Sequence, residues 1–385
     1  MRRLRTASTR RLYGILAVVA LLAATAGIAQ AALGGSASAP DPKPLDRAVL
    51  DALRAPDVNG VSARVKFTNG LLPGGSLPDG AGSPLAQGAE GRLWLAGDGR
   101  FRVELQSDAG DAQIVDDGTR VTIYDPASKT AYTAPSEARD RRAGSAEQPT
   151  LAGVRRALDR LGRTWTLSGA TPGTTGNRPS YTVRIAPKDD GGLLGAAELA
   201  WDAVKGVPLR AAVYAQGDDE PVLELEATDV SFGAIPGSTL SAHLPQGTRV
   251  VELDPPSADA SGHPTRVRGV EAVRARLDFP LSAPAELAGL PRTDVRLVRM
   301  GDRAGALSIY GKGMGAIAVL QHRAAPNDGG VGELRLPEVN IDGATGTELA
   351  TPLGTVVTFS RGGVSYTVAG LVPPVAAENA ARGLR

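Results

Sequence analysis

The sequence predicts an α+β fold in which antiparallel sheets are covered by a few helices. Apolar and polar residues alternate over most of the chain, as in residues 101–125, FRVELQSDAGDAQIVDDGTRVTIYD. Such alternation is typical of strands with one buried face. Gly, Asp and Pro separate the runs at short intervals, which favours hairpins. Hydrophobic residues make up 42% of the chain but aromatic residues only 4%, so aliphatic side chains must form the core.

The N-terminus has the composition of an export signal. Residues 1–11 contain arginines and no acidic residue, and residues 12–33 contain no charged residue. This pattern predicts that residues 1–31 are either a signal peptide cleaved after Ala31 or an uncleaved membrane anchor, since the apolar run is also long enough to span a bilayer. In both cases the rest of the chain leaves the cytoplasm. We therefore expect an extracytoplasmic protein that is secreted or anchored to the cytoplasmic membrane.

Changes in composition divide the remaining chain into two predicted domains. Residues 32–44 are rich in small residues and proline and predict a linker. A second cluster of Pro, Ser, Asp and Gly predicts another linker at 254–264. The first domain then covers residues 45–253, and a small C-terminal α+β domain covers residues 265–385.

Each predicted element follows from its local pattern. Apolar spacing of three to four residues predicts helices at 45–55 and 150–162, the second with Thr150 as its N-cap. Alternation predicts the strands and hairpins of the first domain at 61–68, 91–106, 112–125, 128–134, 181–187, 196–202, 208–217, 221–233 and 247–253. The C-terminal domain has predicted helices at 265–279 and 375–384 and predicted strands at 293–300, 305–311, 316–323, 355–362 and 364–371.

The reactive side chains give no pattern for catalysis or metal binding. The chain has no cysteine, and His243, His263 and His322 have none of the spacings of metal-binding motifs. The glycine-rich stretch 311–316, GKGMGA, lacks a Ser or Thr after Lys312 and lies between two predicted strands, so it predicts a turn rather than a phosphate loop. The net charge of +1 does not favour nucleic acid. We expect no enzyme activity, no cofactor, no metal and no nucleic-acid partner.

The order of several short motifs resembles a known group of proteins. These motifs are DDG at 116–118, IYDP at 123–126, a turn from Asp202 to Arg210, and LPQGTRV at 244–250. In this order they resemble the LolA-like lipoprotein-carrier proteins, which share a fold with the periplasmic sigma-factor regulators RseB and MucB. The C-terminal residues are similar to a small sheet domain of exported or membrane-anchored proteins from Gram-positive bacteria, and no activity follows from that similarity.

The resemblance implies a strongly curved antiparallel half-barrel sheet with helices over its concave side. The cavity between them would hold acyl chains or a hydrophobic peptide segment. The residues expected to face the ligand are Val65, Phe67, Leu93, Leu95, Phe101, Val103, Leu105, Val121 and Ile123. The residues expected to form the lid are Val49, Leu53, Val154 and Leu158. The alternative is that these side chains fill an ordinary core.

Two functions remain as hypotheses. The first is a binding protein that holds a lipid acyl chain or a lipoprotein's lipid in the cavity, because burial of each methylene is worth about 0.8 kcal/mol and needs no catalytic group. The second is an RseB-like regulator that binds the extracytoplasmic part of a membrane anti-sigma factor.

An abundance of alanine, glycine, proline and arginine is typical of a GC-rich genome such as that of an actinobacterium.

Overall fold

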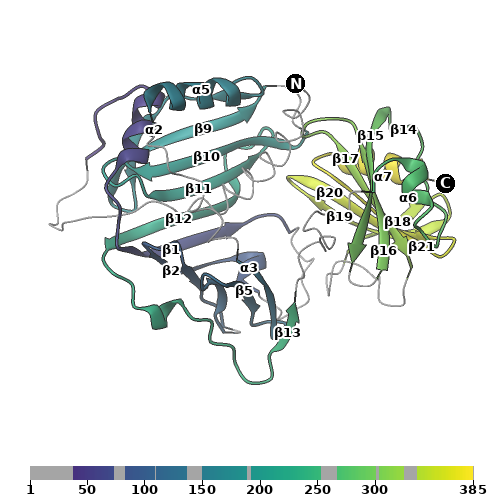
Figure 1. The fold of residues 1–385 in the computed structure, drawn as a ribbon, viewed down its shortest axis with the longest axis horizontal. Coiled ribbons are helices and arrows are strands. Elements are labelled where there is room, and N and C mark those ends of the chain that lie inside the picture. The colour runs from purple at the N-terminus through teal and green to yellow at the C-terminus, as the bar shows by residue number, and fades with distance from the viewer. Residues whose placement is uncertain are drawn as a thin grey trace.

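The molecule contains two sheet domains that lie side by side (Figure 1). A computed structural model describes residues 38–72, 83–108, 110–136, 150–188, 192–252, 267–300, 303–324 and 336–384. The predicted signal or anchor segment and the predicted linker at 254–264 lie outside these ranges. Within them, no helix combines the length and the apolar character that are needed to cross a membrane.

The first domain is built on one large, curved sheet (Figure 1). Its strands are β1 (Gly60–Asn69), β2 (Gly88–Ala96), β3 (Phe101–Leu105), β4 (Ala112–Asp116), β5 (Arg120–Asp125), β6 (Thr130–Pro135), β7 (Trp165–Leu167), β8 (Thr171–Thr175), β9 (Arg178–Pro187), β10 (Leu194–Asp202), β11 (Pro208–Ala215), β12 (Pro221–Phe232) and β13 (Arg249–Glu252). The strand order is β13-β6-β5-β4-β3-β2-β1-β12-β11-β10-β9-β7, and β8 pairs with β9. The predicted half-barrel architecture is confirmed.

Turn residues explain the tight hairpins of this sheet. Gly99, between β2 and β3, has φ +82°, and Gly118, between β4 and β5, has φ +89°. Only glycine adopts such a conformation without steric cost. The Asp117 side chain also accepts hydrogen bonds from the backbone N–H groups of Thr119 and Arg120, at 2.8 and 2.9 Å. The two hairpins that were predicted from these residues are therefore confirmed.

The sheet has one parallel pair, which the sequence did not predict. Strand β13 was expected as an antiparallel strand, but it runs parallel to β6. The chain returns after β12 across the outer face of the sheet through a short 3₁₀ helix, η2 (Gly237–Leu240), whose Leu240 is fully buried. Arg102 on β3 fixes this return segment by donating to the Ser241 carbonyl oxygen at 2.5 Å. Because the chain crosses the sheet before it rejoins the edge, β13 enters in the same direction as β6.

Two helices pair over the β9 end of the sheet (Figure 1). They are α2 (Leu45–Arg54) and α5 (Leu151–Leu161), as predicted. Thr150 is the N-cap of α5 and accepts a hydrogen bond from the Gly153 N–H at 3.1 Å. An ion pair of 2.6 Å between Arg155 and Asp46 joins the two helices. A single helical turn, α3 (Pro84–Gln87), precedes β2.

The second domain is an eight-stranded antiparallel sheet with two short helices, α6 (Val270–Arg274) and α7 (Pro374–Arg382). Its strands are β14 (Glu286–Leu287), β15 (Leu290–Met300), β16 (Arg303–Tyr310), β17 (Ile317–Arg323), β18 (Glu338–Ile341), β19 (Ala344–Thr351), β20 (Gly354–Arg361) and β21 (Val364–Gly370), in the order β14-β15-β16-β17-β21-β20-β19-β18. The core includes Phe359 and Tyr366, whose rings stack with centroids 4.8 Å apart. The helix predicted at 265–279 shortens to α6, which cannot begin before Val270 because Gly269 has φ +91°, outside the helical region.

Candidate functional site: an apolar cavity in the half-barrel

Strand register places one apolar row across half of the first sheet. Ala63 on β1 lies opposite Leu93 on β2, and Leu93 lies opposite Val103 on β3. The row continues to Ile114 on β4 and Ile123 on β5. Residues directly opposite one another in antiparallel strands point to the same face. These five side chains therefore lie together on the concave face.

A second apolar row crosses the other half of the sheet. Phe67 on β1 lies opposite Leu225 on β12, which lies opposite Ala211 on β11. Ala211 in turn lies opposite Leu199 on β10, and Leu199 lies opposite Val183 on β9. The two rows share strand β1, whose pairing with β12 shifts register between Arg64 and Val65, so the concave face is apolar on both sides of β1.

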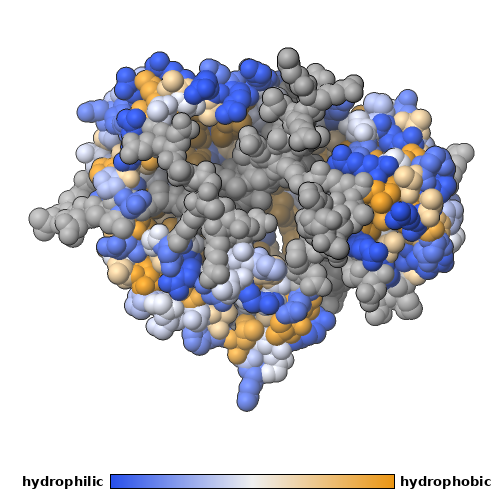
Figure 2. All heavy atoms as spheres, viewed as in Figure 1, coloured by the Kyte–Doolittle hydropathy of each residue, from blue (hydrophilic) through white to orange (hydrophobic). Residues whose placement is uncertain are grey.

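The concave face encloses a cavity of about 650 Å³ with an almost wholly apolar wall. Figure 2 shows hydrophobic residues, in orange, inside the hollow near the centre of the view. The volume is within the range of about 300–1,000 Å³ that is usual for small-molecule sites. All nine residues that the sequence predicted to face a ligand lie in the wall: Val65, Phe67, Leu93, Leu95, Phe101, Val103, Leu105, Val121 and Ile123.

The wall also contains residues that the sequence analysis did not select. The second half of the sheet adds further apolar side chains, including Leu194, Leu199, Ala211, Val213, Leu223 and Leu225. Strands β10, β11 and β12 show the same apolar alternation as β1, so the sequence does contain a signal for these residues.

Three wall residues come from the second domain, and no local sequence signal identifies them. They are Met314 in the turn between β16 and β17, Leu353 in the turn between β19 and β20, and Leu371 just after β21. The stretch 311–316 is indeed a turn, as predicted, but the role of Met314 in the wall depends on how the two domains meet.

The four predicted lid residues are absent from the cavity wall. Val49 packs into a neighbouring core cluster with Tyr181 and Trp201, while Leu53 is 56% exposed. Val154 is buried and Leu158 is half-buried on α5. Leu199 belongs both to that cluster and to the wall, so helix α2 lies on the concave face but beside the cavity. The predicted lid residues miss the cavity because α2 pairs with α5, and this pairing keeps both helices over the β9 end of the sheet.

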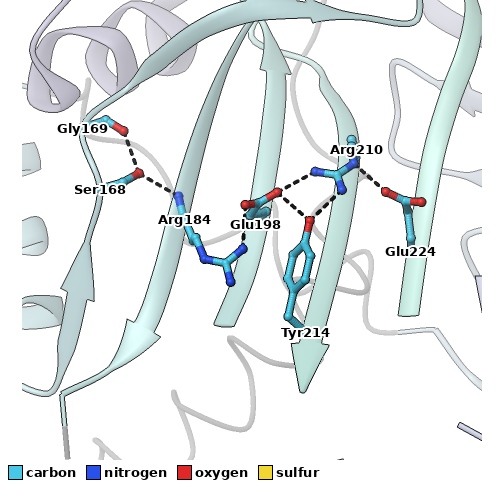
Figure 3. Close-up of polar contacts among 7 residues, drawn as sticks. All are labelled: Ser168, Gly169, Arg184, Glu198, Arg210, Tyr214 and Glu224. Atoms are coloured by element: carbon cyan, nitrogen blue, oxygen red, sulfur yellow. Dashed lines mark hydrogen bonds and ion pairs between the residues drawn. The ribbon is translucent and has the colours of Figure 1, made fainter. Parts of the chain in front are cut away.

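The outer face of the same strands carries an ion-pair network (Figure 3). Glu198 accepts hydrogen bonds from Arg184 at 2.9 Å, from Arg210 at 2.7 Å and from the Tyr214 hydroxyl at 2.8 Å. Arg210 also donates to Glu224 at 2.6 Å. Burial alone would raise the pKa of Glu198, but the three donors outweigh it and lower that pKa overall. The charges satisfy one another across β9 to β12, so the network holds these strands in register.

The described part of the chain contains no group of three or more His, Asp or Glu side chains arranged to hold a metal. His243 is exposed on the return segment, and His322 is half-buried on β17 with its Nδ1 3.0 Å from the Arg323 carbonyl oxygen. His263 lies outside the described residues. The geometry of the site is thus that of an apolar container whose charged residues are paired on the opposite face.

The chain is an α+β protein with an apolar half-barrel cavity and a second sheet domain. No protein-family model and no curated protein matches its sequence. Among solved structures it is similar to MucB in complex with MucA(peri), with 16% identity and a TM-score of 0.43 over 88% of this chain and 96% of that one. It is also similar to the Pseudomonas aeruginosa MucA/MucB complex, with 17% identity and a TM-score of 0.43 over 88% and 96%.

A further similar structure is described as an outer membrane lipoprotein-sorting protein domain from Vibrio parahaemolyticus, with 11% identity and a TM-score of 0.18 over 49% of this chain and 92% of that domain. MucB and a lipoprotein-sorting domain are the two groups that the sequence resemblance named.

Proposed function

We propose that this protein binds the hydrocarbon chain of a lipid, or of a lipoprotein's lipid anchor, in the cavity of its half-barrel. The observation that supports this proposal is a hollow of about 650 Å³ that the side chains of the described residues leave unfilled. About twelve methylene groups transferred from water would contribute about 10 kcal/mol before the entropic costs of binding are subtracted. Against the lower end of those costs, about 4 kcal/mol, this leaves a net gain of about 6 kcal/mol without a single polar contact.

The chemistry of the wall supports an apolar ligand over a charged one. Arg210 and Glu224 are the charged residues among those that line the cavity, but strand register turns their side chains to the outer face, where they pair with each other at 2.6 Å. A ligand carboxylate or phosphate inside the cavity would therefore meet no charged side chain, whereas a hydrocarbon chain only displaces water. A charged headgroup is expected to remain at the mouth of the cavity.

Native mass spectrometry tests the proposal directly. Protein purified without detergent from its exported form should show mass additions of lipid size, and these should disappear after extraction with organic solvent. The extracted protein should then bind a pyrene-labelled dodecanoate, and unlabelled palmitate should displace it. Protein of bare mass that also takes up no labelled fatty acid would refute the proposed function.

A second candidate is a regulator that binds the extracytoplasmic part of a membrane anti-sigma factor. The observation that favours it is the two-domain construction, in which turns of the second domain meet the half-barrel and create a composite surface for an extended segment. The test is co-purification with the external segments of anti-sigma factors from the same genome. If every such segment elutes separately from the intact protein, this candidate is rejected.

Both candidates require the protein to work outside the cytoplasm. The predicted signal or anchor segment is the feature that supports this location. Fractionation of cells with an antibody to the second domain should recover the protein outside the cytoplasm, in the membrane fraction if the segment is retained and in the soluble fraction if it is cleaved.

A further inference from the structure

The apolar residues that the second domain contributes to the cavity lie outside that domain's own core. Met314, Leu353 and Leu371 are half-buried and lie in turns or just after a strand, where polar residues are usual. None of the three belongs to the large core cluster that surrounds Phe359 and Tyr366. All three line the cavity together with first-domain residues, so the cavity accounts for apolar side chains at these positions.

A backbone contact fixes the second domain at one end of the cavity. The Leu193 N–H donates to the Leu371 carbonyl oxygen at 2.8 Å. The adjacent Gly192 has φ +66°, and a Cβ atom at this position would lie only 1.9 Å from the same oxygen. Glycine is therefore needed both for the turn and for the close approach of the two backbones. The next residue, Leu194, is itself part of the cavity wall.

The strand registers define the two ends of the cavity. Near the Leu194 end lie Val213 and Leu223, which face each other across β11 and β12. At the opposite end, Leu95 and Val207 pack together with Val61. From Val61 to Phe67 the wall extends over seven residues of β1, whose six steps correspond to about 20 Å. The second domain closes the Leu194 end of this length.

We propose that Met314, Leu353 and Leu371 set the length of hydrocarbon chain that the cavity accepts, because they form its end wall. This inference rests on the proposed function and goes beyond it by assigning chain-length selection to the second domain. It also makes ligand binding and domain docking interdependent, since a chain that contacts the end wall stabilises the docked arrangement, and docking in turn raises the affinity for that chain.

Chain-length profiles test the assignment. Saturated fatty acids from octanoate to stearate compete with a fluorescent fatty acid for the full chain, and affinity rises about fourfold for each added methylene until the chain reaches the end wall. Replacing Met314 with Trp (Met314→Trp) narrows the end and should move the plateau to shorter chains. Met314→Ala enlarges the end and should move the plateau to longer chains, so the pair remains informative even if the larger side chain impairs folding.

A second pair of variants separates docking from backbone strain. Gly192→Ala places a methyl group against the Leu371 oxygen and should undock the second domain, with a loss of about fifteenfold in affinity for long chains, the contribution of two methylenes. Gly217 is the matched control, because it has φ +85° in the turn between β11 and β12 but no atom within 4 Å of a Cβ. Gly217→Ala imposes the same kind of strain and should leave the profile unchanged.

The outcomes distinguish this inference from the function on which it rests. If the parent protein binds none of the fatty acids, the proposed function fails. If the parent protein shows a plateau that neither Met314 variant moves, or if Gly192→Ala and Gly217→Ala give the same profile, the half-barrel binds lipid but the second domain does not set the chain length. Opposite shifts by the two Met314 variants, together with a loss confined to Gly192→Ala, support the inference. Thermal unfolding of each variant confirms that the fold is retained.

Discussion

The variant Ala211→Asp places a carboxylate in the middle of the concave face. Ala211 is half-buried in the cavity wall, and its opposite neighbours on the adjacent strands are Leu199 and Leu225. In the empty protein the cavity is accessible to water, so the new carboxylate stays hydrated and the fold should tolerate it. A hydrocarbon chain in the cavity would strip that water away. The substitution therefore acts on ligand binding far more than on folding.

The size of the expected affinity loss follows from the absence of hydrogen-bond donors around the new carboxylate. The facing residues are apolar, so they offer no donor to a desolvated carboxylate. Burial of a polar group without a hydrogen bond costs about 2–7 kcal/mol, and a charge costs more. A cost of about 3 kcal/mol already lowers the affinity by about 150-fold. Ala211→Val is the control, because valine is similar in size to aspartate but apolar, and it should change the affinity by no more than about fivefold.

Displacement of a fluorescent fatty acid measures the effect, and thermal unfolding measures the stability of the empty protein. We expect a large loss of affinity at neutral pH that becomes smaller as the pH falls and the carboxyl group is protonated. If Ala211→Asp binds fatty acid as tightly as Ala211→Val while both remain folded, the chain does not lie along this wall, and the assignment of the cavity as the lipid site is refuted.

Three further predictions concern the frame around the cavity. Glu198→Gln should lower the free energy of unfolding by about 1–3 kcal/mol at neutral pH. Because folding lowers the pKa of Glu198, this loss of stability should be fully present above the unfolded pKa of 4.5 and should shrink as the pH falls through the folded pKa. Urea unfolding of the variant and the parent at neutral pH and at about pH 3 checks this. Glu348→Gln should stabilise the folded protein by about 1 kcal/mol at neutral pH, because burial and the nearby Glu378 raise the pKa of Glu348 and its Oε2 has no hydrogen-bond partner. This gain in stability should vanish in acid, where the parent's carboxyl group is protonated as well. A gain that persists in acid would contradict the reasoning. Asp202→Ala should cost about 3–5 kcal/mol, since this fully buried carboxylate accepts from Arg178 and from the N–H groups of Val204 and Lys205, each at 2.8 Å; Asp202→Asn should cost less in the same urea titration, because it keeps an acceptor for the turn.

The elements that sequence analysis placed well are those with strong local signals. Alternating residues with a Gly-containing turn predicted the hairpins β2–β3 and β4–β5, and Thr150 predicted the start of α5. The hairpin of β18 and β19 was missed, although Asp342 and Gly343 form its turn with φ +47° and +86°. Gly346 interrupts the apolar alternation of β19, since it lies opposite Phe359, and a Cβ there would lie 3.0 Å from the Phe359 side chain. The Phe359 side chain and the Thr358 carbonyl oxygen leave no room for a side chain at position 346, so the apolar residue that would have continued the alternation is missing from the sequence.

The candidate site could be predicted only in part, for a physical reason. Period-two alternation identifies which face of a strand is apolar, and this was sufficient for all nine wall residues in β1 to β5. It does not specify where a helix will settle, so Val49 and Leu158 were expected over a cavity that they do not reach. It also contains no information about contacts between domains, and for this reason Met314, Leu353 and Leu371 were not selected.

The second domain is covalently tied to the half-barrel through β13, the edge strand that runs parallel to β6. A domain held on such a tether returns to its docking position as an intramolecular event, at an effective concentration that reaches the millimolar range for short linkers. The contacts that the described residues make between the domains, such as the Leu193–Leu371 hydrogen bond and the three apolar side chains of the end wall, can therefore be sufficient, although such contacts would not hold two separate molecules together. A weak but tethered contact closes readily and also opens readily, which suits a container that has to be both filled and emptied.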